Sequence, residues 1–186
     1  PIHEEIAPHP VSPYGASKLA GEGYCSAYAR TYGINTVTLR FGNVYGPRSK
    51  HKSSVVAKFI RKAIAGEVCE IYGDGTQTRD FIYIDDVVQA SVKACKSKNT
   101  HNHEIYNVGT GKSRSFQDIS DILQKELSTN LGNKYISNPY SGYQMNTQAE
   151  ITKTNENLGF VPNFSLESGI NSYINEIKRL HLEKNQ

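Results

Sequence analysis

A tyrosine and a lysine four residues apart, Tyr14 and Lys18, are side chains whose types and spacing could do acid–base chemistry. In a helix this spacing puts both side chains on one face, one turn apart. A tyrosine hydroxyl in a model peptide ionises near pH ~10, so it needs a nearby cation to accept a proton close to neutrality. With 12 tyrosines in the chain, chance alone gives about one such pair, so the spacing alone does not establish a site.

The elements that must position this pair can be read from the flanking residues. Ser12 and Pro13 are typical of a helix N-cap and first turn, and Gly33 is typical of a helix C-cap. The sequence therefore predicts a helix over residues 14–32. Residues 35–41 are rich in Val, Leu and Thr and predict a strand directly after it.

The rest of the chain alternates between helical and extended patterns. Helices are expected over residues 55–65, 85–96 and 115–127, near 151–158 and over 165–180, and strands over 69–72, 79–84, 105–108 and 134–137. We expect residues 42–52 to form a loop, and Asp85 and Asp86 to cap the helix that they open.

Strands separated by helices indicate an α/β fold with a parallel sheet. Residues 35–41 and 105–108 are expected to be adjacent parallel strands. Open parallel sheets bind ligands at the carboxyl ends of their strands, which here are residues 41–46 and 108–111.

Composition narrows the class of protein. A hydrophobic content of 37% and a charged content of 21% are ordinary for a globular domain. A net charge of +3 is too small and too mixed to indicate a nucleic-acid partner. The sequence has no apolar run long enough for a membrane span and no secretory leader pattern, so we expect no membrane partner.

The cysteines and the ends of the sequence add two expectations. Cys25, Cys69 and Cys95 are odd in number and form no Cys-x-x-Cys pair, which indicates reduced thiols in a cytoplasmic protein. His101 and His103 lack the carboxylate or cysteine framework of a metal site, so no metal is expected. The sequence opens with proline and its one methionine is residue 145, so we expect it to be part of a longer protein.

Four segments in order resemble the extended short-chain dehydrogenase/reductase family, in its NAD-dependent epimerase/dehydratase branch. They are residues 12–22 (SPYGASKLAGE), 39–48 (LRFGNVYGPR), 71–87 (IYGDGTQTRDFIYIDDV) and 106–111 (YNVGTG). The likeness to UDP-glucose 4-epimerases covers nearly the whole chain. It implies the C-terminal part of a Rossmann-type parallel sheet, over about residues 1–52 and 85–111, plus a small mixed α/β substrate-binding lobe, over about 53–84 and 112–180.

The resemblance implies roles for individual residues. Tyr14 would be the acid/base residue, and Lys18 would hold the nicotinamide ribose and keep Tyr14 acidic. Tyr14, Lys18, Phe41 and Asn43 would contact NAD, with NADP as an alternative cofactor. The substrate would be a nucleotide-diphosphate sugar, inverted at one carbon through a transient keto intermediate. Full enzymes of the family often form homodimers through the helix that carries Tyr14.

Three residues are assigned to the substrate by the same resemblance, each with an alternative. Asn43 would contact the sugar or phosphate, or else form a turn. Arg79 would bind the diphosphate through its planar guanidinium, or else form a surface ion pair with Asp80 or Asp74. Tyr72 would lie beside the base, or else belong to the core of the lobe.

Two departures from the family pattern keep alternatives open. The sequence has no glycine-rich dinucleotide turn, so we expect the isolated chain neither to bind NAD tightly nor to turn over. Residues 138–144 and 147–152 are more similar to ADP-glycero-manno-heptose 6-epimerase than to UDP-sugar epimerases. A sugar-nucleotide 4,6-dehydratase and a non-catalytic binding or assembly module remain rival functions.

Overall fold

The computed structural model describes residues 1–48, 54–98, 102–140 and 143–183. Its helices are α1 (Pro13–Tyr32), α2 (Val55–Ile64), α3 (Ile84–Lys96), α4 (Phe116–Glu126), α5 (Thr152–Leu158) and α6 (Leu166–Glu183). Its strands are β1 (Thr36–Phe41), β2 (Asn43–Tyr45), β3 (Cys69–Tyr72), β4 (Thr78–Tyr83), β5 (His103–Val108), β6 (Ser113–Ser115) and β7 (Asn133–Ile136). The strands pair in parallel except for β4 with β6, which confirms the predicted α/β fold.

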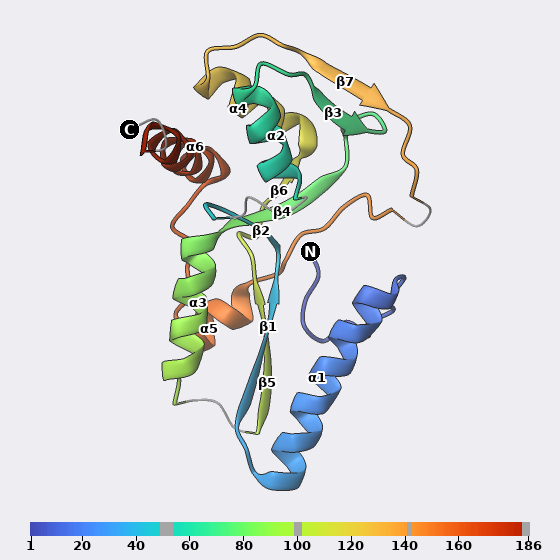
Figure 1. The fold of residues 1–186 in the computed structure, drawn as a ribbon. Helices are drawn as coiled ribbons and strands as arrows, with labels where there is room; N and C mark the ends of the chain where they lie inside the picture. Colours follow the sequence, from blue (N-terminus) through green and yellow to red (C-terminus); the bar gives the residue numbers. More distant parts are fainter. Residues whose placement is uncertain (49–53, 99–101, 141–142, 184–186) are drawn as a thin grey trace.

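The elements form an elongated molecule with two parts, which meet at the three-stranded sheet β2–β4–β6 (Figure 1). In one part, which we call the Rossmann-type part, β1 and β5 lie between α1 on one side and α3 and α5 on the other. The other part, the lobe, gathers α2, α4 and α6 with the strand pair β3–β7.

The pair β1–β5 is the sheet of the Rossmann-type part. Its strands are parallel, and their register runs from Thr36 opposite His103 to Phe41 opposite Val108, which confirms the predicted adjacency. Side chains alternate across a strand, so its two faces meet different neighbours. One face of β1 packs on a cluster of apolar side chains from β4, α3, β5 and the α5 region: Ile82, Val87, Ala90, Ala94, Tyr106, Val108, Leu158 and Phe160.

Helix α1 begins and ends where the sequence predicts. The Ser12 hydroxyl accepts a hydrogen bond from the Gly15 N–H at 3.1 Å, and Pro13 is the first helical residue. The helix ends at Gly33, whose φ of 67° is left-handed and favours glycine. Among the helix residues, Ala29 alone is buried.

The lobe has the larger apolar core. Helix α2 buries Phe59, Ile60 and Ala63, whose three- and four-residue spacing defines one helix face. This face meets α4, α6 and the strands β3 and β4 in one continuous cluster. Fully buried members of the cluster are Ile60, Ile71, Ile119, Leu123 and Ile170.

Two expectations about local structure are wrong. Residues 43–45 form β2 instead of loop, because they pair in parallel with residues 81–83 of β4. Asp85 and Asp86 lie in the first turn of α3, as expected, but neither is its N-cap: Tyr83 is the N-cap and makes no side-chain cap bond. The buried Asp86 carboxylate instead accepts hydrogen bonds from the N–H groups of Asn163 and Phe164, at 2.9 and 3.1 Å. It therefore anchors the segment that leads into α6.

The division of the chain between the two parts at residue 112 stays a prediction. Helix α5 lies beyond that boundary and yet packs on β5 of the Rossmann-type part. Leu158 and Phe160 lie in the same apolar cluster as Tyr106 of β5.

Candidate functional site

Tyr14 and Lys18 lie one turn apart on α1, and the Lys18 ammonium is 5.2 Å from the centre of the Tyr14 ring. Both side chains are exposed, the tyrosine to 72%. The ammonium is within the range of a cation–π contact with the ring. The predicted geometry of the pair is therefore present, and its catalytic role stays a prediction.

The direction of α1 determines where Tyr14 and Lys18 lie relative to β1. The chain turns back at Gly33, so α1 and β1 run side by side in opposite directions (Figure 1). The first turns of α1, which carry Tyr14 and Lys18, therefore lie toward the carboxyl end of β1.

An ion pair holds α1 against β1. The Arg40 guanidinium of β1 donates to both carboxylate oxygens of Glu22 on α1, through Nε at 2.8 Å and Nη2 at 2.7 Å. Its Nη1 donates to the Glu4 backbone oxygen at 3.0 Å. The hydrogen bonds that Arg40 donates to Glu22 outweigh burial and raise the pKa of Arg40. Because this bidentate contact joins helix, strand and N-terminal segment, it fixes the direction of the helix that carries Tyr14.

Phe41 and Asn43 lie where β1 ends and β2 begins. Phe41 is 48% exposed, and Asn43 is exposed and pairs in register with Phe81 of β4. A side chain at Gly42 would bring a Cβ atom to 2.7 Å from the Asp80 backbone oxygen, so only glycine fits this close approach. The alternative of a simple turn at Asn43 is wrong, because the residue belongs to a strand.

Arg79 is buried in the lobe instead of lying on the surface. Its guanidinium sits between the Phe116 and Tyr143 rings, 5.6 and 5.1 Å from their centres. Nη1 donates to the backbone oxygens of Thr78 and Met145, at 2.8 and 3.2 Å. Burial lowers the pKa of Arg79.

Within the described residues no carboxylate forms an ion pair with Arg79. The alternative of a surface ion pair with Asp80 or Asp74 is therefore wrong. A buried guanidinium carries its charge at a cost unless an anion balances it. An anionic ligand would supply the negative charge that balances the Arg79 guanidinium.

Tyr72 ends β3 at the edge of the lobe core. It is half-buried, packs edge-on against Tyr140 at 5.9 Å, and lies 5.9 Å from the Lys58 ammonium. Its ring is outside the continuous apolar cluster of the lobe. The position of Tyr72 therefore favours the prediction of a ring beside the nucleotide base over the alternative of a core tyrosine.

Sequence reasoning overlooked Asp80, which is buried where the two parts meet. Its Oδ1 accepts from the N–H and hydroxyl of Thr110, and its Oδ2 accepts from the N–H groups of Gly111 and Ala149. The sequence suggested a pair with Arg79, but adjacent residues of a strand point to opposite faces. The alternation of side chains along a strand was the sequence signal that could have placed Asp80 on the face opposite Arg79.

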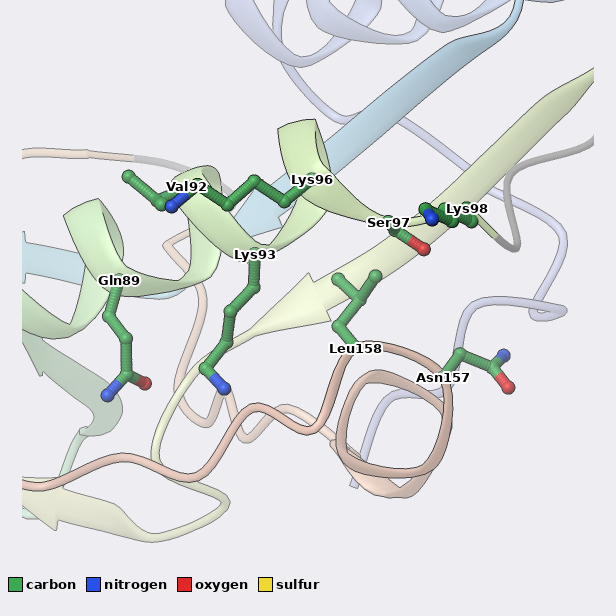
Figure 2. A pocket seen from close by; sticks show the side chains of 8 residues that line it. All are labelled: Gln89, Val92, Lys93, Lys96, Ser97, Lys98, Asn157 and Leu158. Atoms are coloured by element: carbon green, nitrogen blue, oxygen red, sulfur yellow. The ribbon is translucent and has the colours of Figure 1, made fainter.

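A hollow lies apart from these residues, between the second half of α3 and α5 (Figure 2). Lys93 reaches toward α5, and its ammonium donates to the Gly159 backbone oxygen at 2.8 Å. None of the predicted site residues lines this hollow.

No group of three potential metal ligands occurs within the described residues, and His101 lies outside them. The three cysteines are free thiols. In the described part of the chain, no helix has the length and apolar character to span a bilayer.

Comparisons with known proteins agree on one family. The putative UDP-glucose 4-epimerase of Methanocaldococcus jannaschii is 39% identical over 180 residues, covering 96% of this chain and 57% of that protein. The UDP-glucose 4-epimerase of Mycolicibacterium smegmatis is 33% identical, covering 91% of this chain and 54% of that protein. This chain thus spans somewhat more than half the length of these relatives.

Solved structures give the same result for the fold. The crystal structure of Thermotoga maritima UDP-glucose 4-epimerase with UDP-glucose matches with a TM-score of 0.90 at 34% identity, over 97% of this chain and 58% of that one. Bacillus cereus UDP-glucuronic acid 4-epimerase with UDP-glucuronic acid and NAD matches with a TM-score of 0.88 at 34% identity, over 96% and 56%. The family model described as NAD dependent epimerase/dehydratase matches residues 1–109, and the chain belongs to that family.

Proposed function

We propose that this chain supplies the acid–base pair and the substrate-binding lobe of an NAD-dependent UDP-sugar 4-epimerase. The observation that carries the proposal is the exposed Tyr14–Lys18 pair in the first two turns of α1. The names of the relatives support a UDP-sugar substrate and inversion at carbon 4.

Proton transfer is the task of the pair. Tyr14 takes the proton from a sugar hydroxyl while the carbon beneath it is oxidised, and it returns the proton when the carbon is reduced from the other face. Lys18 lies beside Tyr14, with its ammonium 5.2 Å from the centre of the ring. Bound NAD supplies the hydride acceptor for this chemistry.

The residues present fit one end of such a cofactor. Phe41 offers an exposed apolar surface, and the exposed side chains of Lys18 and Asn43 offer hydrogen-bond donors for a ribose or an amide. They do not fit the pyrophosphate, because no glycine-rich dinucleotide turn occurs in the sequence. The isolated chain is therefore proposed to need a separate cofactor-binding part for turnover.

Arg79 and Tyr72 are proposed to hold the nucleotide end of the substrate. The buried Arg79 guanidinium would gain a counter-ion from the diphosphate. Tyr72 at the lobe edge would lie against the base.

Helix α1 is proposed to pair with α1 of a second copy. Tyr24, Tyr28 and Tyr32 follow one another at four-residue spacing and are 69%, 54% and 67% exposed. Aromatic side chains in such a stripe are typical of interfaces. Replacing Tyr28 with glutamate should shift a dimer to monomer in analytical ultracentrifugation.

Substrate binding is tested by calorimetry with UDP-glucose and with an ADP-sugar. We expect the chain to prefer UDP-glucose, and Arg79→Ala to abolish the heat of binding. The control is Arg114→Ala, which removes the arginine opposite Arg79 in the β4–β6 register. A wild-type chain that binds neither nucleotide would contradict a substrate lobe and favour the non-catalytic assembly module.

Catalysis is tested after a cofactor-binding part from a relative is supplied with the chain. Tyr14→Phe should lower kcat by about 10²–10⁴-fold without preventing UDP-glucose binding. A 4,6-dehydratase is the second candidate, because part of an Arabidopsis thaliana protein named for UDP-glucose 4,6-dehydratase activity is 37% identical over 123 residues. Analysis of the reaction product distinguishes the two activities. A 4-keto-6-deoxy sugar as product would overturn the epimerase assignment. Turnover by the chain alone would overturn its proposed dependence on a second part.

A further inference from the structure

We propose that Asp80 is a positioning residue, which fixes the substrate-binding lobe relative to the helix that carries the proton-transfer pair. This inference rests on the proposed function. Asp80 is 2% exposed, and its four partners are neutral donors on other segments, at 2.7–3.2 Å. Among the described residues no cation forms an ion pair with it, so these donors are what stabilises the buried charge.

The segments around Asp80 approach too closely for side chains. A Cβ at Gly109 would lie 2.6 Å from the Asp80 carboxylate and 2.8 Å from the Ala149 side chain. A Cβ at Gly42 would lie 2.7 Å from the Asp80 backbone oxygen. Gly42 follows β1 and Gly109 follows β5, so the carboxyl ends of both strands converge on this residue.

The other face of β4 belongs to the lobe. Arg79 precedes Asp80 and points among the lobe's aromatic rings, whereas Phe81 follows it and pairs in register with Asn43. Three consecutive residues of one strand thus connect the proposed diphosphate-binding arginine, the carboxylate anchor and the proposed substrate-contacting asparagine. A shift of β4 at Asp80 moves Arg79 and Asn43 together.

A chain of hydrogen bonds links the same residue to Glu22 in the middle of α1. Asp80 accepts the Ala149 N–H, and the residues on either side of Ala149 exchange backbone hydrogen bonds with Ile2 at 2.7 and 2.9 Å. Two residues further on, Glu4 accepts the Asn107 N–H through its carboxylate and the Arg40 guanidinium through its backbone oxygen. Arg40 in turn holds α1.

Asp80→Asn is the matched change, because it keeps the volume of the side chain and removes its charge. One acceptor oxygen becomes an NH2 group that faces N–H or O–H donors. We expect amide hydrogen exchange at Gly111, Ala149 and Ile2 to become faster. With the cofactor-binding part supplied, we expect kcat to fall about 10–100-fold, because a misplacement of about 1 Å has an effect of this size. The Kd for UDP should change by less than about threefold, since the lobe contacts are intact.

Asp86→Asn is the control. Asp86 is equally buried and accepts two backbone N–H groups, but these donors belong to the segment before α6. It should lower the unfolding midpoint in a comparable way while leaving kcat per folded molecule unchanged.

The outcomes separate the two proposals. If wild-type protein does not bind UDP, the proposed function fails before Asp80 is tested. If it binds UDP and turns over, but Asp80→Asn leaves kcat unchanged, the positioning role is wrong. A parallel loss of kcat, UDP affinity and folded fraction in both variants would reduce Asp80 to a purely structural residue and also overturn the inference.

Discussion

The lobe core and helix α1 of the Rossmann-type part are held in place by different kinds of interaction. The lobe buries a continuous apolar core across three helices and several strands, with side chains such as Ile60 and Ile119 completely buried. In the Rossmann-type part, α1 buries only Ala29, and β1 is nowhere fully buried. There, the bidentate Arg40–Glu22 pair makes the directional contact between helix and strand. Apolar burial maintains the lobe, whereas a few polar contacts orient the helix that carries Tyr14.

The largest expected effect comes from truncating the lobe core. Ile60→Ala should lower the free energy of unfolding by about 2–5 kcal/mol, because it removes transfer free energy and leaves a cavity. The matched control is Ile64→Ala on the same helix, since Ile64 is 39% exposed whereas Ile60 is fully buried. Urea unfolding followed by circular dichroism measures both. Equal losses from the two variants would mean that the lobe core is not the main source of stability.

A smaller effect is expected where α1 meets β1. Glu22→Gln keeps the shape of the side chain but weakens both charge-assisted bonds to Arg40, at a cost of about 1–2 kcal/mol for this partly exposed pair. Amide hydrogen exchange should accelerate along α1 and stay unchanged along α2 and α4. Glu70→Gln is the control, because it weakens a partly exposed pair with Lys62 in the lobe. If exchange accelerates equally in all three helices, the pair does not act locally on α1.

Local patterns made most of the elements predictable from the sequence. The helix bounds at Ser12 and Gly33 depend on residues next to them, and the Tyr14–Lys18 geometry depends on a four-residue spacing. Even the adjacency of the strands over 35–41 and 105–108 followed from the alternation of elements.

Local sequence patterns did not predict the contacts between residues that are distant in the sequence. Arg79 acquires its environment from Tyr143 and Met145, and Asp80 acquires its donors from Thr110 and Ala149, all on other segments. β2 was missed because three residues have no readable period, and its strand character comes from pairing with β4. The sequence thus indicated which residues could act but not which residues hold them.

The smallest effect concerns the surface of the lobe and its pH dependence. Burial raises the pKa of Asp118, but hydrogen bonds from Ser115 and Arg114 outweigh it and hold the pKa below its ordinary value of 3.8. For Glu167, a hydrogen bond from its own backbone N–H lowers the pKa of the carboxylate, although burial raises it. A hydrogen bond from Arg114 lowers this pKa further. A carboxylate whose folded pKa is depressed adds stability above the unfolded pKa and loses it as the pH falls through the folded value.

Arg114→Met should therefore destabilise the protein near pH 7 by at most about 1 kcal/mol, because all three side chains are partly exposed. The difference from wild type should shrink as the pH falls from about 5 toward 2, where both carboxylates become protonated. Urea unfolding at several pH values measures this difference. The capping box of α4 remains in the variant, because Asp118 still accepts the Ser115 N–H. If the difference in the free energy of unfolding instead grows toward low pH, the direction of both pKa shifts is wrong. The conclusion that charge pairs make only a small contribution to a lobe stabilised by its apolar core would then be wrong as well.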